Sequence, residues 1–272
     1  MSPSTGPELP PPLRWWGSPL SESRVNLELA RLLVSPVFRG VGVPRGDGRP
    51  VLLVPGFLAG DVTLAVLHSW LRRGGYRTYR SGIAWNADCS EAAVRRLDRR
   101  VLDVAERRGE QVTVIGHSRG GLFARALGVR RPSRVRQVIT LGSPLAGHFD
   151  ASALTLAAAG GARLAQNVLR PARPGCMTVS CPCAFTADMT APAPLPLTSI
   201  WSSRDGIVRP SSCRPADAEC LQVTGSHLGL AANVAVYRHL ATVLSRSAPV
   251  RALSACSPLA CPTAETHARW DT

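Results

Sequence analysis

The sequence contains no lysine, so all 32 of its basic side chains are arginine. Only 18 aspartates and glutamates oppose them, which leaves a formal net charge of +14 at pH 7. That excess first suggests a protein that binds polyanions. A complete preference for arginine over lysine is also typical of a compositional bias of the genome, however, so the charge by itself is weak evidence for such a function.

Long apolar runs are also missing. No uninterrupted run reaches the roughly 18 residues of a membrane-spanning helix, and the alanine-rich stretch from Ala151 to Ala162 contains two glycines and ends at Arg163. The first twelve residues are proline-rich, without the basic start and apolar core of a signal peptide. We therefore predict a cytoplasmic protein without a transmembrane segment.

The eight cysteines leave secretion open as an alternative. In an oxidising compartment the close pairs Cys213/Cys220 and Cys256/Cys261 would be disulfide candidates. A third group, Cys176, Cys181 and Cys183, has no histidine nearby and lacks a usual zinc spacing. We expect neither a metal nor an organic cofactor.

What the chain does contain is enough apolar surface for one large core, because 45% of its 272 residues are hydrophobic. From Val51 onward, short β-like runs alternate with stretches of helical period, which indicates a parallel sheet with crossover helices. The expected strands are Val51 to Val54, Tyr76 to Arg80, Val112 to Ile115, Val135 to Leu141, Leu197 to Trp201 and Leu221 to Thr224. The fold class is therefore α/β, a doubly wound and mainly parallel six-stranded sheet.

The same pattern divides the chain into segments. Residues 1–48 form an N-terminal arm with one helix, roughly Ser21 to Val34, and residues 49–245 form the α/β domain. About fifty residues, 146–196, separate two strands where one crossover helix needs far fewer, so we expect an inserted cap-like segment that could act as a lid. Within it, Ala151 to Leu169 can be helical and Arg170 to Pro196 reads as loop. Residues 246–272 form a polar tail.

A helix expected from Ser90 has an apolar face formed by Val94, Leu97, Val101 and Ala105, and many arginines elsewhere on its surface. The segment lacks interleaved aromatics and contains four acidic residues as well. Mixed charges are typical of a solvated helix face, so we expect no specific nucleic-acid binding, although the charge is compatible with peripheral association with anionic membranes.

The strongest local motif is Gly116-His117-Ser118-Arg119-Gly120, a G-x-S-x-G sequence between an expected strand and an expected helix. In that position Ser118 occupies a sharp, strained turn, which the small neighbours Gly116 and Gly120 allow to close. Its hydroxyl would stand above the sheet at a helix N-terminus, where developing negative charge is favoured. Ser118 is therefore the candidate nucleophile.

A serine nucleophile needs a base and a carboxylate that orients the base. His227 follows the last strand and Asp205 follows the strand before it, so both would lie at the carboxyl edge of the sheet with Ser118. His148 is a second candidate base, His239 falls inside a helix, and Asp188 and Asp217 are weaker rivals of Asp205 because neither directly follows a strand. His117 is expected to point away from Ser118.

A tetrahedral oxyanion also needs two donors. We expect the backbone N–H groups of Arg119 and of Phe57, which lies in the glycine-flanked turn after the first strand. The side chain of Arg119 either biases the site towards anionic substrates or projects into solvent. Arg204 and Arg209 are the other arginines close in sequence to the candidate site.

These residues resemble the α/β-hydrolase superfamily, and in particular small bacterial lipases and esterases. The resemblance rests on the Pro-Gly-Phe turn at 55–57, the elbow at 116–121, the segment 140–144, the segment 198–205 and the segment 226–230. It implies Ser118 as nucleophile, Asp205 as acid, His227 as base, and Phe57 with Arg119 as oxyanion donors. Two departures are Pro55, where such proteins usually have histidine, and Arg119, where they usually have methionine or glutamine.

The prediction is a serine hydrolase that cleaves small-molecule or lipid carboxylic esters through an acyl-enzyme. An acyltransferase would use the same residues with another acceptor in place of water, and a non-catalytic binding protein could share the same fold. Both remain alternatives at this point.

Overall fold

The computed structural model describes residues 22–146, 160–161 and 183–246. Six strands form one sheet in the order β2-β1-β3-β4-β5-β6, and every neighbouring pair is parallel. The strands are β1 (Pro50–Val54), β2 (Arg77–Arg80), β3 (Val112–His117), β4 (Val135–Leu141), β5 (Leu197–Ser202) and β6 (Glu219–Val223). The expected fold class is confirmed, with β6 starting two residues earlier than the sequence pattern predicts.

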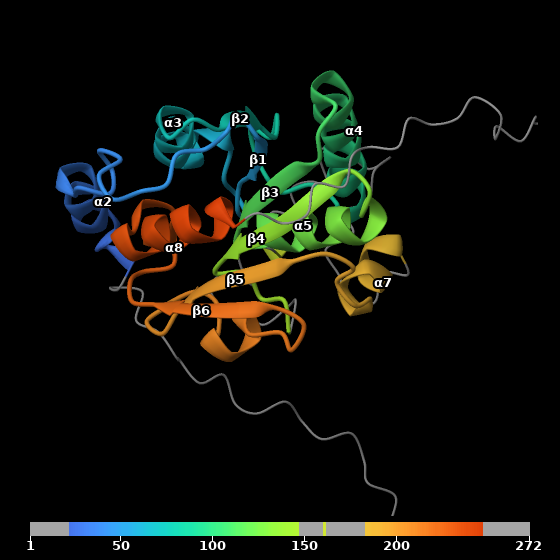
Figure 1. The fold of residues 1–272 in the computed structure, drawn as a ribbon. Helices are drawn as coiled ribbons and strands as arrows, with labels where there is room; N and C mark the ends of the chain where they lie inside the picture. Colours follow the sequence, from blue (N-terminus) through green and yellow to red (C-terminus); the bar gives the residue numbers. More distant parts are fainter. Residues whose placement is uncertain (1–21, 147–159, 162–182, 247–272) are drawn as a thin grey trace, which may run out of the picture.

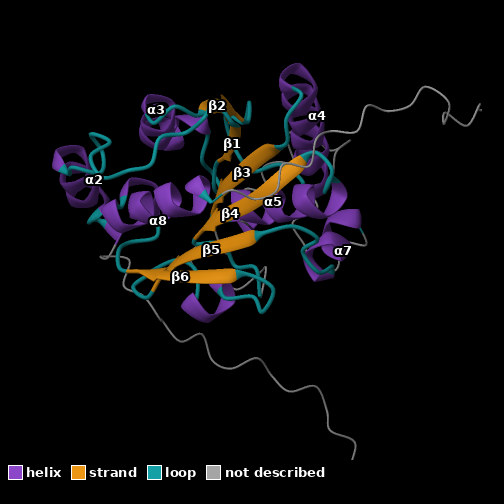
Figure 2. Ribbon diagram, in the orientation of Figure 1, coloured by secondary structure: helices purple, strands orange, loops and turns teal. Residues whose placement is uncertain are grey.

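Helices cover both faces of the sheet (Figure 1). The helices are α2 (Val25–Val34), α3 (Ala65–Arg73), α4 (Ser90–Arg108), α5 (Arg119–Arg130), α7 (Ala184–Thr190) and α8 (Val234–Ser245). Short 3-10 helices, η1 (Asp61–Leu64), η2 (Pro210–Cys213) and η3 (Leu228–Ala232), lie in the connections. Figure 2 shows how this arrangement leaves the sheet as the middle layer.

Two separate apolar clusters follow from the alternation of side chains along each strand. Val51 and Leu53 of β1 point into a cluster with α2, α3 and α8, whereas Leu52 and Val54 point into a cluster with α4, α5 and α7. The predicted inward face of α4 is buried in the second cluster. Strands that are buried on both faces in this way are characteristic of a parallel sheet.

The end of the inserted segment differs from the sequence-based expectation. Residues 184–190 form α7 rather than loop, and Phe185 of α7 packs edge-on against Phe123 of α5 with the ring centroids 5.8 Å apart. Asp188 of α7 is 2.6 Å from the guanidinium of Arg130. This part of the insertion therefore covers the core. Most of the predicted lid lies outside the described residues, as do His148, the tail after residue 246 and residues 1–21 of the N-terminal arm.

Two further expectations can be compared with the structure. Cys220 is a free thiol, so the candidate pair Cys213/Cys220 is not joined by a disulfide. In the part of the chain that is described, no helix is both long and apolar enough to cross a membrane.

Candidate active site

Ser118 is the single residue between the end of β3 and the start of α5. Its backbone has φ 52° and ψ −124°, in the left-handed region that a side chain makes costly. Its N–H donates to the carbonyl of Leu141 at the end of β4, 2.8 Å away. The turn is thus held by the sheet in a strained conformation, and Ser118 stays partly exposed next to the buried His117.

The glycines around Ser118 are required by close backbone contacts. A Cβ on Gly116 would lie 2.3 Å from the carbonyl oxygen of Gly120, and a Cβ on Gly120 would lie 2.3 Å from that of Val54. Real Cβ atoms do not approach a backbone oxygen so closely. The turn can therefore close against β1 only with glycine at both positions, which is the role the sequence motif predicts for them.

Asp205 and His227 are in direct contact. His227 Nδ1 is 2.7 Å from Asp205 Oδ2, and both residues are almost completely buried, with 2% and 1% exposure. The other carboxylate oxygen of Asp205 accepts from the N–H groups of Ile207 and Val208 at 2.9 and 2.8 Å. Asp205 therefore does more than reverse the chain, because its side chain fixes both its own loop and the imidazole.

Burial alone lowers the pKa of His227, but the Asp205 carboxylate and the more distant charge of Glu22 outweigh it, so the pKa is raised above its ordinary value. In the neutral form of His227 the bond to Asp205 uses the Nδ1 proton, which leaves Nε2 as the proton acceptor.

The His227 loop and the Ser118 turn meet around the residue that follows β4. A Cβ on Gly142 would lie 3.1 Å from His227 Nδ1 and 3.2 Å from Asp205 Oδ2, and Gly142 follows Leu141, the acceptor of the Ser118 N–H. The segments that follow β3, β4, β5 and β6 thus converge at the carboxyl edge of the sheet. This is the edge where open α/β sheets bind their ligands.

His117 does not simply point away from the site. Its Nε2 is 3.0 Å from the carbonyl oxygen of His227, and the two imidazole rings have centroids 5.0 Å apart. Burial, together with the nearby His227, lowers the pKa of His117 to about 4. At neutral pH the ring is uncharged and donates its Nε2 proton to the His227 carbonyl, so His117 ties the nucleophile turn to the loop of the candidate base.

The turn after β1 lies against Ser118, because a Cβ on Gly56 would be 3.2 Å from Ser118 Cβ. Leu58 has φ 54°, and Leu58 and Ser118 are the two described non-glycine residues with positive φ. Asn86 holds the turn, since its carbonyl accepts from Leu58 N–H at 3.0 Å and its side-chain amide donates to Pro55 O at 2.8 Å. Among the described residues, none accepts a hydrogen bond from Phe57 N–H.

The side chain of Arg119 does not project freely into solvent. Its guanidinium donates to Asn86 Oδ1 at 2.9 Å, to Asp88 O at 2.6 Å and to Ser90 Oγ at 3.1 Å. It also lies over the ring of Phe123, 4.9 Å from the centroid. Arg119 therefore cross-links α5 to the loop before α4, and its guanidinium also lies 5.7 Å from the centroid of the Phe57 ring.

Two glutamates that the sequence pattern does not single out bind the candidate catalytic loops. Glu28 of α2 accepts from Ser226 N–H at 2.8 Å and from Ser226 Oγ at 2.6 Å. Glu22, just before α2, accepts from His227 N–H at 3.0 Å and from Gly206 N–H at 3.2 Å. The N-terminal segment thus binds the loop that follows Asp205 and the loop that contains His227. No local motif in the sequence indicates these contacts.

The rival acids are engaged elsewhere. Asp217 pairs with Arg125 at 2.7 Å, and Asp188 pairs with Arg130. His239 lies within α8, as the sequence predicts. Among the described residues, no group of three or more histidine, cysteine, aspartate and glutamate side chains is placed to hold a metal ion.

Comparisons with known proteins agree with this architecture. A family model described as palmitoyl protein thioesterase matches residues 50–181. Among curated proteins, none matches this chain in sequence. The mature lipase BlEst2 of Bacillus licheniformis has a similar structure, with a TM-score of 0.54 and 16% identity over 75% of this chain and 95% of the lipase.

Two other solved structures are similar. The thioesterase domain from the curacin biosynthetic pathway has a TM-score of 0.51 and 15% identity, over 73% of this chain and 91% of that domain. A soluble variant of monoglyceride lipase from Saccharomyces cerevisiae has a TM-score of 0.52 and 14% identity, over 75% of this chain and 89% of the lipase. At these identities the likeness establishes a shared fold.

Proposed function

We propose that this chain, which has the α/β-hydrolase fold, is a serine hydrolase that cleaves acyl esters or thioesters through a covalent acyl-enzyme. A shared fold does not determine a reaction, so the proposal rests on the site. The observation that carries it is the buried Asp205–His227 pair at the same sheet edge as Ser118, which occupies a strained turn between β3 and α5.

In this mechanism Ser118 Oγ attacks the acyl carbon while His227 Nε2 takes the hydroxyl proton. The carbonyl π electrons move to oxygen, and the negative charge is stabilised by the backbone N–H groups of Phe57 and Arg119. Asp205 keeps the imidazole oriented and stabilises its protonated form. Collapse of the tetrahedral intermediate expels the alcohol or thiol, which receives the proton from His227.

A water molecule then repeats the sequence on the acyl-enzyme. His227 removes a proton from water, the resulting hydroxide attacks the acyl carbon, and Ser118 Oγ leaves with the proton, which releases the carboxylic acid and restores the enzyme. If an alcohol or thiol acceptor replaces water in this step, the protein is instead an acyltransferase.

The match to the thioesterase model makes thioesters a specific second substrate class. A comparison of nitrophenyl esters with acyl thioesters of equal chain length separates the two classes. Competing alcohols distinguish acyl transfer from hydrolysis through the products formed. Nitrophenyl esters of increasing length, assayed above and below their solubility limit, test a lipid interface, because a rate increase at that limit indicates lipase behaviour.

The decisive experiment for the mechanism is labelling with a fluorophosphonate probe that reacts with activated serines. We expect the wild-type chain to be labelled and Ser118→Ala to be unlabelled and inactive, with an unchanged circular dichroism spectrum. Ser133→Ala, at an exposed serine near the start of β4, serves as the matched control. Equal labelling of Ser118→Ala, or no labelling of the wild-type chain, would overturn the proposal.

A further inference from the structure

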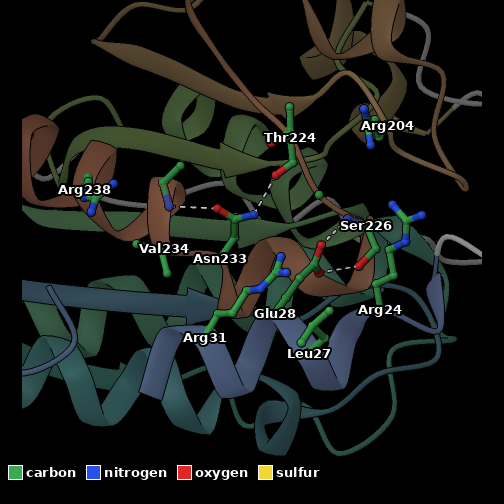
Figure 3. A pocket seen from close by; sticks show the side chains of 12 residues that line it. Arg24, Leu27, Glu28, Arg31, Arg204, Thr224, Ser226, Asn233, Val234 and Arg238 are labelled. Carbon is green, nitrogen blue, oxygen red and sulfur yellow. Dashed lines mark hydrogen bonds between the residues drawn. The ribbon is translucent and has the colours of Figure 1, made fainter. Parts of the chain in front are cut away.

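A pocket of about 330 Å³ lies beside the candidate active site, between α2, the start of α8 and the loop that precedes His227 (Figure 3). Four arginines from three parts of the chain line it. Arg24 and Arg31 belong to the α2 segment, Arg204 follows β5, and Arg238 belongs to α8. The pocket is thus built by tertiary packing and not by a local run of basic residues.

The four guanidinium groups have no carboxylate partner, unlike several arginines elsewhere in the described residues. Arg125, Arg130 and Arg131 each form ion pairs with carboxylates at 2.7 Å or less. Within residues 22–146, 160–161 and 183–246, by contrast, none of the four pocket arginines has a hydrogen-bond or ion-pair partner for its side chain. Like charges gathered around one cavity repel each other unless an anion lies between them.

The one carboxylate that lines the pocket is already engaged. Glu28 turns towards Ser226 in Figure 3, and each of its oxygens accepts one hydrogen bond from that residue. Four arginines against one glutamate leave three positive charges in excess among the lining residues. An anion with two negative charges would therefore be stabilised here even with Glu28 ionised.

The other buried polar side chains of the lining are satisfied by the protein itself. Asn233 accepts from the first N–H groups of α8 and donates to Thr224 O. The four guanidinium groups and the Thr224 hydroxyl therefore remain available to a ligand. The guanidinium fork matches the geometry of phosphate oxygens, and its charge does not depend on pH in the physiological range. Leu27, Val234 and Ala235 add apolar wall.

From these observations we propose that the pocket binds a phosphate monoester through Arg24, Arg31, Arg204 and Arg238, with the apolar wall taking part of the attached organic group. The site is separate from the acyl-transfer chemistry, but Arg204 directly precedes Asp205 and Ser226 directly precedes His227. The bound phosphate therefore contacts both loops that carry the Asp205–His227 pair. Its source is either a soluble phosphate ester or the headgroup of an anionic lipid.

Binding is tested in the Ser118→Ala chain, so that the result does not depend on whether the protein is a hydrolase. Inorganic phosphate and glycerol phosphate are titrated by calorimetry at constant ionic strength. Co-sedimentation with phosphatidylcholine vesicles, with and without phosphatidic acid, tests the lipid source. We expect saturable binding of the soluble ester, of the phosphatidic acid vesicles, or of both, and the pattern identifies the source.

The variants Arg31→Gln and Arg204→Gln each remove one guanidinium, and we expect each to weaken binding by about 10-fold or more. Arg99→Gln is the matched control, because it removes the same charge from an exposed position on α4 and should leave binding unchanged. Circular dichroism verifies that all variants are folded. Equal weakening by Arg99→Gln, or no saturable binding of any of the three probes, would overturn the proposal.

Discussion

The contact between Glu28 and Ser226 leads to the most direct quantitative prediction. Replacing Glu28 with alanine removes the acceptors of the two hydrogen bonds that Ser226 donates, at 2.8 and 2.6 Å. Ser226 is only 1% exposed. Each buried donor left without an acceptor costs about 1–3 kcal/mol. Glu28 borders the open pocket, so water can replace part of the loss, and we expect Glu28→Ala to lower the free energy of unfolding by about 2–4 kcal/mol.

The activity should fall as well, because Ser226 directly precedes His227. A displacement of the base by about 1 Å can reduce turnover roughly 100-fold. We expect kcat/KM for a nitrophenyl ester to fall by about 10- to 100-fold in Glu28→Ala. In Glu28→Gln, which keeps one acceptor for Ser226, both the stability loss and the activity loss should be about half as large on the free-energy scale.

Urea denaturation followed by circular dichroism measures the stability, and initial rates well below the unfolding transition measure the activity. Glu106→Ala is the control, since Glu106 is an exposed glutamate on α4. The expected order of destabilisation is Glu28→Ala, then Glu28→Gln, then Glu106→Ala with almost no effect. The reasoning fails if Glu28→Ala unfolds at the same urea concentration as Glu106→Ala, or if it is destabilised while retaining full activity at low temperature.

Four other outcomes are expected. The base must be unprotonated and the pKa of His227 is raised, so kcat/KM should rise with pH to a plateau with a midpoint above 6.5. The variant Asp205→Asn should have both a lower midpoint and a lower plateau. A wild-type midpoint below 6.5 contradicts this expectation. By the same linkage, the stability that His227 contributes is complete below pH 6.5 and is lost as pH rises through the folded-state pKa, which pH-dependent urea titrations of wild-type and His227→Gln chains can measure. Arg119→Gln should lower the melting temperature by several degrees without changing the preference between neutral and anionic esters, since its side chain holds a loop; a changed preference in rate assays would refute the structural role. Gly116→Ala should yield little folded protein, because its Cβ would lie 2.3 Å from Gly120 O, and normal expression of an active variant would argue against that contact.

Much of the architecture could be predicted because its signals are local. Five of the six strands overlap closely with the expected runs, and the parallel order follows from strands that alternate with helices. The candidate residues Ser118, Asp205 and His227 could be chosen because each follows a strand, and the carboxyl ends of parallel strands share one edge. Their catalytic roles stay predictions, while the contact between Asp205 and His227 is part of the structure.

Other features of the structure could not be predicted, because they depend on contacts with remote segments or have no local sequence signal. The sequence around Arg119 contains no sign that its guanidinium binds Asn86 and Asp88, and the prolines near residue 190 obscure the short helix α7. The strained backbone of Leu58 also has no local signal, since leucine rarely adopts positive φ.

The sequence by itself determined which segments form strands, the glycine-flanked serine turn and the candidate acid and base, because apolar periodicity and turn chemistry act over a few residues. Only the tertiary structure decided that Glu22 and Glu28 hold the His227 loop, some 200 residues away along the chain, and that four arginines surround one pocket. Such contacts depend on how the helices pack over the sheet. The composition shows that arginine is in excess, but only the packing of the helices brings four of these arginines together around one pocket.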